Sequence, residues 1–327
     1  MPWFESAFES PALLASAFVL AASVSALGSA WAIAHAHRND LFDQPGERRS
    51  HDTPTPRGGG VGIVVATLAT MLIVIWTGLT SASWWWAAGG LVLVAATGWW
   101  DDHRPLPAWP RLLVHAIAAA CLAGAVHLQG ADGVVVITAF AMTLVLVNAW
   151  NFMDGINGLA ASQAMLCALG FAMVLGDVPR LLALVLAGAC LGFLPFNFPR
   201  ARIFLGDVGS GALGYLVAML LAAGFASHPP ASWPLLLLPA AAMLADTGLT
   251  LIWRMRRGER WWQPHVQHAY QQWSRSFGHA RVSLGYATFS GVAAMAMLAL
   301  MPVGYVGGTG VIVALLLVCL AVWSRSR

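Results

Sequence analysis

Residues 208–226 read VGSGALGYLVAMLLAAGFA, a run without a charged side chain. About 20 apolar residues in a helix cross the hydrocarbon core of a bilayer, so this run has the length and composition of a transmembrane helix. Similar runs recur along most of the chain. Of its 327 residues, 59% are hydrophobic and 9% are charged, against about 25% charged in soluble domains. Lipid is therefore the expected solvent for most of the protein.

Continuous apolar runs predict helices, because lipid admits only helices and closed barrels, and barrel strands alternate in polarity. The predicted fold is an all-α, polytopic integral membrane protein in which residues 1–327 form a single transmembrane domain. Hydropathy gives about 11 transmembrane helices, with 10 as the alternative. The expected spans are 11–34, 59–79, 82–98, 111–130, 133–150, 156–175, 181–197, 208–226, 233–253, 283–301 and 304–323.

The arginines predict the orientation, because cytoplasmic loops carry an excess of positive charge. The chain has no lysine, and with eleven spans every arginine except Arg180 falls on one side of the membrane. That side is expected to face the cytoplasm, with the N-terminus in the periplasm of a Gram-negative cell. The net charge of +3 is explained by these topology signals, and no nucleic-acid partner is expected. The cysteines lie inside apolar spans without metal-ligand spacing, so no disulfide framework or zinc site is predicted.

Five carboxylates gather at the expected cytoplasmic span ends. A carboxylate at the bilayer centre costs about 2.5–3.5 kcal/mol on insertion scales, so acidic groups near the boundary require partners or a function. The alternative is that each is a solvated loop residue. Because the five share one face of the membrane, they predict a site there: Asp101, Asp102, Asp154, Asp207 and Asp246.

Two motifs carry most of these carboxylates. In GWWDDHRPLPAWPRL (98–112), adjacent acids repel one another unless a cation or a proton lies between them, which indicates a divalent metal or a general base. An exposed acidic turn is the alternative. In NAWNFMDGINGLA (148–160), a continuing helix places Asn148, Asn151 and Asp154 along one face, which suits a polar ligand. A polar contact between helices is the alternative there.

Three further motifs offer groups for phosphate. In FPRARIFLGDVGSGALGY (198–215), Arg202 and the amides of a helix N-terminus are expected to bind an anion, and Asp207 to bind magnesium. Small-residue packing is the alternative. In RMRRGERWWQPHVQHAYQQW (254–273), His265 and His268 share a spacing of i, i+3. In DQPGERRSHDTPTPRGGGVGI (43–63), His51 and Arg57 flank prolines before three glycines, where a rigid connector is the alternative.

Together, these side chains predict phosphoryl transfer. The carboxylates suit a hard cation, the arginines and histidines suit phosphate oxygens, and the amides suit a nucleotide base or a sugar. A lipid-borne substrate would explain why this chemistry lies in a bundle of membrane helices.

These motifs, in this order from about residue 43 to residue 270, resemble the polyprenyl-phosphate N-acetylhexosamine-1-phosphate transferase family, glycosyltransferase family 4. The shared segments are DQPGERRSHDTPTPRGGG, DDHRPLPAWPR, NFMDGING, RIFLGDVGS and ADT. The resemblance implies a phosphoglycosyltransferase of the bacterial inner membrane with a cytoplasmic active site. Its implied substrates are UDP-N-acetylhexosamine and undecaprenyl phosphate, its cofactor is Mg²⁺ or Mn²⁺, and its products are UMP and an undecaprenyl-pyrophosphoryl sugar. Membrane lipid surrounds such an enzyme, and a homodimer is suggested by analogy alone.

By resemblance, Asp101 and Asp102 match the aspartate pair that activates the lipid phosphate near the metal, and whether Asp101 is a base or a nucleophile stays open. Asp207 matches the metal-ligand aspartate, and Asn151 with Asp154 matches the nucleotide-sugar region. The predicted catalytic residues are Asp101, Asp102, Asp154, Asp207, His265 and His268. The predicted substrate-binding residues are His51, Arg57, Asn148, Asn151, Asn157, Arg202 and Asp246. The predicted metal ligands are Asp207, Asp154 and Asp102.

One departure concerns the histidine motif, because Gln267 stands where much of the family has a histidine. The residues that follow, Ala269, Tyr270 and Gln271, resemble the subgroup that starts O-antigen and lipopolysaccharide synthesis, which suggests GlcNAc, FucNAc or QuiNAc as the sugar. The rival function is a transporter, since intramembrane carboxylates also line ion paths. A transporter predicts charges near the membrane midplane, whereas these charges gather at one face.

Overall fold

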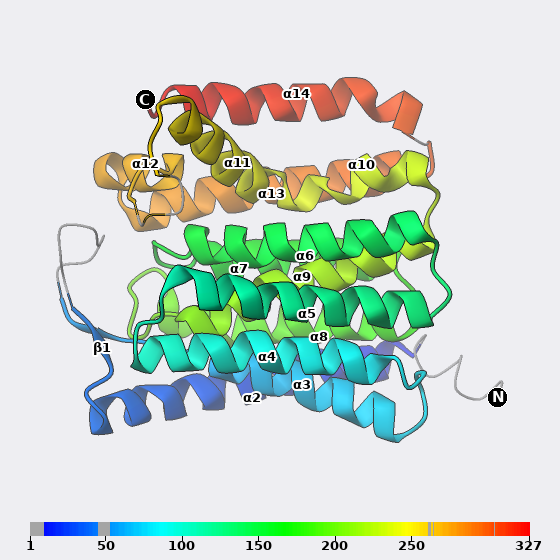
Figure 1. Cartoon of the computed structure of the whole chain (residues 1–327), viewed down its shortest axis with the longest axis horizontal. Helices are drawn as coiled ribbons and strands as arrows, with labels where there is room; N and C mark the ends of the chain where they lie inside the picture. Colours follow the sequence, from blue (N-terminus) through cyan, green and yellow to red (C-terminus); the bar gives the residue numbers. More distant parts are fainter. Residues whose placement is uncertain (1–9, 45–52, 261–262, 264, 304) are drawn as a thin grey trace.

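The computed structural model describes residues 10–44, 53–260, 263, 265–303 and 305–327, which form an all-α bundle (Figure 1). Two-residue strands β1 (Phe42–Asp43) and β2 (Thr55–Pro56) pair antiparallel beside it. The helices are α2 (Pro11–Arg38), α3 (Val61–Trp76), α4 (Trp84–His103), α5 (Ala108–Leu128), α6 (Gly133–Met153), α7 (Leu159–Val174), α8 (Asp177–Asn197), α9 (Asp207–Ser227), α10 (Trp233–Leu236), α11 (Ala241–Arg256), α12 (Ala269–Phe277), α13 (His279–Leu300) and α14 (Tyr305–Ser324).

The polytopic all-α prediction is confirmed, because each expected apolar run falls on helix. Within the described residues, seven helical segments are long and apolar enough to cross a membrane. Helices α3 and α7 and residues 308–324 of α14 are apolar but shorter. The orientation of the bundle and its division into domains stay predictions.

The run at 233–253 is interrupted, although it was expected to form one continuous span. Short 3₁₀ turns occupy Pro230–Ser232 and Leu238–Ala240 on either side of α10, and α11 begins only at Ala241. Proline lacks the amide hydrogen that continues a helix and clashes with the preceding turn. Pro234 and Pro239 therefore explain why this span is built from pieces.

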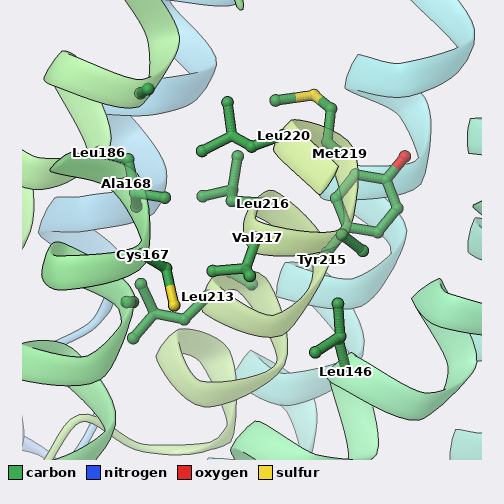
Figure 2. Packing of buried hydrophobic residues seen from close by; sticks show 14 of the residues in the cluster. Leu146, Cys167, Ala168, Leu186, Leu213, Tyr215, Leu216, Val217, Met219 and Leu220 are labelled. Atoms are coloured by element: carbon green, nitrogen blue, oxygen red, sulfur yellow. The ribbon is translucent and has the colours of Figure 1, made fainter. Parts of the chain in front are cut away.

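Helix α9 lies at the centre of the bundle, and nearly all of its side chains are buried. Figure 2 shows Leu213 and Val217 of α9 directed toward Cys167 of α7, with Tyr215 on the other side of the helix. The Tyr215 hydroxyl donates to the Ala87 carbonyl of α4 at 2.9 Å, which satisfies a polar group inside the core. Any side chain that α9 presents at its N-terminus is therefore held by a rigid, fully packed helix.

Glycines allow α3 and α4 to approach the N-terminus of α9 at backbone distance. A Cβ atom on Gly98 of α4 would lie 2.3 Å from the Asp207 carbonyl oxygen, and one on Gly60 would lie 2.2 Å from the Gly209 Cα. Small residues at such contacts are typical of helix packing in membranes. This approach brings the end of α4 beside the start of α9.

The Gly98 contact predicts that Gly98→Ala lowers both Tm and activity, because the added methyl group pushes α4 away from Asp207. The control is Gly89→Ala in the same helix, where a Cβ would meet no atom within 4 Å. Alanine is the better helix former by about 1 kcal/mol, so the control is expected to be neutral or stabilising. Thermal unfolding of both purified variants in detergent measures the difference, and equal Tm values would contradict the contact.

Candidate active site

The Asp102 side chain caps the N-terminus of α9 from the neighbouring helix. Its two carboxylate oxygens accept hydrogen bonds from the amides of Asp207 at 3.0 Å and of Val208 at 3.1 Å. Asp102 is buried, and hydrogen bonds to charged groups contribute about 1.5–3 kcal/mol each. Gly206, at φ +77°, lies against this carboxylate, where a Cβ would come within 2.6 Å of an Asp102 oxygen. The cap therefore fixes the position and direction of the Asp207 side chain.

This cap corrects one expectation. The amides at the start of α9 were expected to bind an anionic ligand, yet Asp102 accepts the first two, and Gly209 and Ser210 donate theirs to the Gly206 carbonyl. The protein supplies its own anion at this helix N-terminus. Phosphate binding must therefore rely on side chains.

Asp101 and Asp207 converge on one cation. Arg111, in the first turns of α5, places Nη1 2.9 Å from Asp101 Oδ2 and 3.4 Å from Asp207 Oδ2. The two carboxylates therefore share one guanidinium group. Asn151 of α6 donates from Nδ2 to Asp207 Oδ1 at 2.6 Å and lies 3.2 Å from the Ser210 hydroxyl. Residues from α4, α5, α6 and α9 thus meet at one end of the bundle.

Asp154 follows the last residue of α6 and lies close enough to Asp102 for the two carboxyl groups to interact electrostatically. Desolvation by the surrounding protein, together with the negative charges of Asp102 and Asp43, raises the pKa of Asp154 to about 8. The pKa of an unperturbed aspartate is about 4. Between these two values, the unfolded carboxyl group ionises while the folded one keeps its proton, so stability falls as the pH rises.

Asp154→Asn, which cannot ionise, is expected to raise Tm over the wild type by more at pH 9 than at pH 5 in protein stripped of divalent metal. Calorimetry or scanning fluorimetry at the two pH values measures this difference. Asp132→Asn removes a carboxyl group at the opposite end of α6 and serves as the control. The same Tm gain at both pH values would show that the carboxyl of Asp154 is not strained by burial.

Asp246 organises a second cluster in the same way that Asp102 organises the first. Its carboxylate accepts from the amides of Ala269 at 2.8 Å and Tyr270 at 3.0 Å, which are the first two residues of α12. It also accepts from the Tyr286 hydroxyl at 2.8 Å, and one oxygen lies 3.6 Å from Nδ1 of the buried His268. Asp246 thus supports His268 and α12, and its role in binding substrate stays a prediction.

The rings of the two histidines of this segment lie against each other, with 4.8 Å between their centroids and a tilt of 32° between their planes. His265 is half-buried, while His268 is 2% exposed and lies behind it. Burial, followed by the neighbouring His268 and Arg254, lowers the pKa of His265 to about 3, so His265 is neutral at physiological pH. A neutral imidazole can accept a proton or donate a hydrogen bond, which suits it to an exposed position beside phosphate oxygens.

Gln267, which stands in place of a family histidine, is tied to a buried arginine. Its Oε1 accepts from Arg254 Nη1 at 2.5 Å, and Arg254 also pairs with Glu259 at 3.0 Å and donates to the Arg260 carbonyl. The amide oxygen of glutamine accepts a hydrogen bond from the guanidinium group, and the amide stays neutral at any physiological pH. The substitution therefore replaces a titratable group by a fixed anchor for the segment.

Tyr270 joins the two clusters. Its buried side chain donates from the hydroxyl to the Phe152 carbonyl of α6 at 2.9 Å, and the Phe152 ring stacks on His268 with 6.1 Å between centroids. The end of α6, which carries Asn151 and Asp154, is therefore bound to the start of α12, which carries the histidines.

The remaining predicted residues are divided between this site and other roles. The charge of Arg57 acts on Asp101 and Asp102, and its buried Nε has no hydrogen-bond partner among the described residues. Three others make structural contacts instead: Asn148 donates to the Leu144 carbonyl, Asn157 to the Pro199 carbonyl, and Arg202 to the Pro195 carbonyl while stacking on Phe196. His51 lies outside the described residues.

Sequence reasoning did not assign Arg111, Ser210, Tyr270 or Arg254 to the site. Arg111 was interpreted, with the other arginines, as a topology signal or phosphate contact and not as a partner of Asp101, although it lies in the quoted DDHRPLPAWPR motif, ten residues after Asp101. The prolines that end α4 and begin α5 turn the chain back, which brings Arg111 to Asp101. Within the described residues, no group of three or more His, Cys, Asp or Glu could hold a metal ion, so the predicted metal ligands stay a prediction.

Comparison with known proteins relates the chain to a family of membrane transferases. The family model described as glycosyl transferase family 4 matches residues 84–224. The decaprenyl-phosphate N-acetylglucosaminephosphotransferase of Mycobacterium tuberculosis (strain ATCC 25618 / H37Rv) is 33% identical over 76% of this chain and 73% of its own. The corresponding protein of Mycobacterium leprae (strain TN) is 31% identical over 79% and 76%. The phospho-N-acetylmuramoyl-pentapeptide-transferase of Thermosynechococcus vestitus is 46% identical over a shorter stretch, 25% of this chain and 21% of its own.

Proposed function

Because the chain belongs to the polyprenyl-phosphate N-acetylhexosamine-1-phosphate transferases of glycosyl transferase family 4, we propose that it transfers an N-acetylated sugar-1-phosphate from a UDP-sugar to a polyprenyl phosphate. The reaction joins the lipid phosphate to the sugar phosphate, breaks the pyrophosphate bond of the donor and releases UMP. The convergence of Asp101, Asp207, Asn151 and Arg111 at one end of an apolar bundle carries this proposal. This arrangement would place charged side chains beside the phosphate of a substrate whose polyprenyl chain is dissolved in the membrane.

The donor set fits a divalent cation. Neighbouring carboxylates are stable only when a proton or a cation lies between them, and Asp101 and Asp207 share such a cation in Arg111. Mg²⁺ typically uses one or two carboxylates together with substrate phosphates, so a cluster of three acidic ligands is not required. Asp207 would hold Mg²⁺ or Mn²⁺ beside Asp101, and the metal would neutralise charge on the transferring phosphate. The role of Asp102 is to hold the α9 N-terminus in place.

The chain's own cations and amides account for binding and orientation. Arg57, whose Nε has no hydrogen-bond partner among the described residues, and Arg111, which lies between Asp101 and Asp207, would hold phosphate oxygens, because guanidinium binds phosphate through paired N–H groups. Asn151 orients Asp207, and the neutral His265 can donate to or accept from a phosphate oxygen. Asp101 can accept the acidic proton of the lipid phosphate. Positioning and charge neutralisation of this kind account for most catalysis of phosphoryl transfer.

We propose UDP-N-acetylglucosamine as the donor, because the mycobacterial relatives that align with most of the chain are named for that sugar. Undecaprenyl phosphate is the proposed acceptor. The arginine distribution supports an active site on the cytoplasmic side of the bacterial inner membrane, with service in O-antigen, lipopolysaccharide or related cell-wall synthesis. A transport function is less consistent with the structure, since Asp101, Asp154 and Asp207 lie at helix ends and not along a path through the bundle.

The test is release of UMP by purified protein from a panel of UDP-N-acetylhexosamines, with undecaprenyl or decaprenyl phosphate, Mg²⁺ or Mn²⁺, and EDTA controls. Release that requires both lipid and metal, with one sugar preferred, is the expected result. Folded protein that releases no UMP with any donor and acceptor would contradict the proposed reaction.

Asp207→Asn is expected to lower turnover by about 100-fold or more, in line with the loss of a positioned charged group. The amide keeps the size of the side chain, and the backbone N–H that bonds Asp102 is unchanged, so Tm should change little. Asp177→Asn is the matched control, because Asp177 also lies in the first turn of a helix, α8. Near-normal turnover by Asp207→Asn would remove this carboxylate from the reaction.

A further inference from the structure

The last residues of the chain contact the histidine segment. Beyond the end of α14, the Arg327 guanidinium lies 4.4 Å from the ring centroid of Trp253 and 4.3 Å from that of Trp323. It donates from Nη1 to the Gln267 carbonyl at 2.8 Å and from Nη2 to the Thr250 hydroxyl at 2.9 Å. The planar guanidinium thus uses its faces and its edge together, which lysine cannot reproduce.

Thr250 connects this arginine to the catalytic histidines. Its buried hydroxyl accepts from Arg327 and from the Trp323 indole N–H, both at 2.9 Å, and donates to Asp246 Oδ1 at 3.2 Å. The same Asp246 oxygen lies 3.6 Å from His268 Nδ1. A continuous line of polar contacts therefore runs from Arg327 through Thr250 and Asp246 to His268.

Gln267, between the two histidines, is held at two points. Arg327 binds its backbone carbonyl, and Arg254 binds its side chain. Segment 265–268 has no regular secondary structure. These contacts therefore hold it in place of the backbone hydrogen bonds that a helix or strand would have. Fixing both the backbone and the side chain of Gln267 restricts the adjacent His268 and, two residues earlier, His265.

We propose that Arg327 is a positioning residue of the reaction, which holds the His265–His268 segment through the Gln267 carbonyl and the Thr250–Asp246 relay. The inference rests on the proposed function, since it assigns the histidines to that site. The simpler alternative is that Arg327 only attaches α14 to α11. The two explanations differ in whether removal of the Arg327 side chain lowers the reaction rate by displacing His265 and His268.

Amide hydrogen exchange tests the structural half of the proposal without any substrate. Arg327→Ala is expected to raise the exchange of residues 265–271 while that of α9 stays unchanged. Arg325→Ala is the control, because it removes an equal charge two residues earlier and none of the Arg327 contacts. Equal exchange of the segment in the two variants would overturn the proposal, whatever the enzyme's substrate is.

A double-mutant cycle tests the functional half. Arg327→Ala is expected to lower kcat about tenfold with little change in KM for the donor, as misplacement of a reacting group does. It should cause almost no further loss in a His268→Asn background, because residues that act as a unit are not additive. Independent, multiplicative losses would mean that Arg327 does not act through His268.

Two further arms separate the outcomes. Thr250→Val keeps the shape of the side chain and removes its hydroxyl bonds with Asp246, Arg327 and Trp323, while the Arg327 bond to the Gln267 carbonyl can remain. An intermediate loss of kcat is therefore expected, and the same cycle is run with this variant if Arg327→Ala does not fold. Wild-type UMP release is measured alongside. Absence of wild-type turnover would contradict the proposed function, and unchanged exchange or an additive cycle with an active wild type would contradict this inference alone.

Discussion

The site depends on the two hydrogen bonds between the Asp102 carboxylate and the amides of Asp207 and Val208. Helix α9 is the most deeply buried helix of the bundle, and an uncapped N-terminus there would leave amides without partners in a medium that offers no water. The cap solves this problem and determines where the Asp207 side chain lies. Since Asp101 precedes Asp102 in α4, it too is carried to the same place.

The same solution occurs at the other cluster, where Asp246 of α11 accepts the first two amides of α12. In both cases, a carboxylate in one helix stabilises the start of another, and a side chain of the proposed site lies at or next to the capped residues. Asp207 is the first residue of α9, and His268 immediately precedes α12. Each cap therefore links the folding of a helix to the placement of one reactive group, and Tyr270 holds the two arrangements together.

Composition and hydropathy predicted the all-α membrane fold and the helix positions well, because lipid leaves the backbone few alternatives. Motif reasoning correctly brought Asp101, Asn151 and Asp207 together, since all three lie at helix ends on one side. It could not separate Asp101 from Asp102, as adjacent acids look alike until helix direction assigns one to a cap. Nor could it find the contact of Arg327 with Gln267, because that contact joins residues 60 positions apart without a local pattern.

The glycine contacts around α9 have a consequence for how members of such a family diversify. Gly98 and Gly60 have no space for a side chain, so a substitution at either position would shift the backbone of the neighbouring helices. The histidine side of the site is held by side chains that can be exchanged in concert, as Gln267 with Arg254 illustrates. Substitutions on the α11, α12 and α14 side would therefore disturb the backbone frame less than substitutions on the α3, α4 and α9 side.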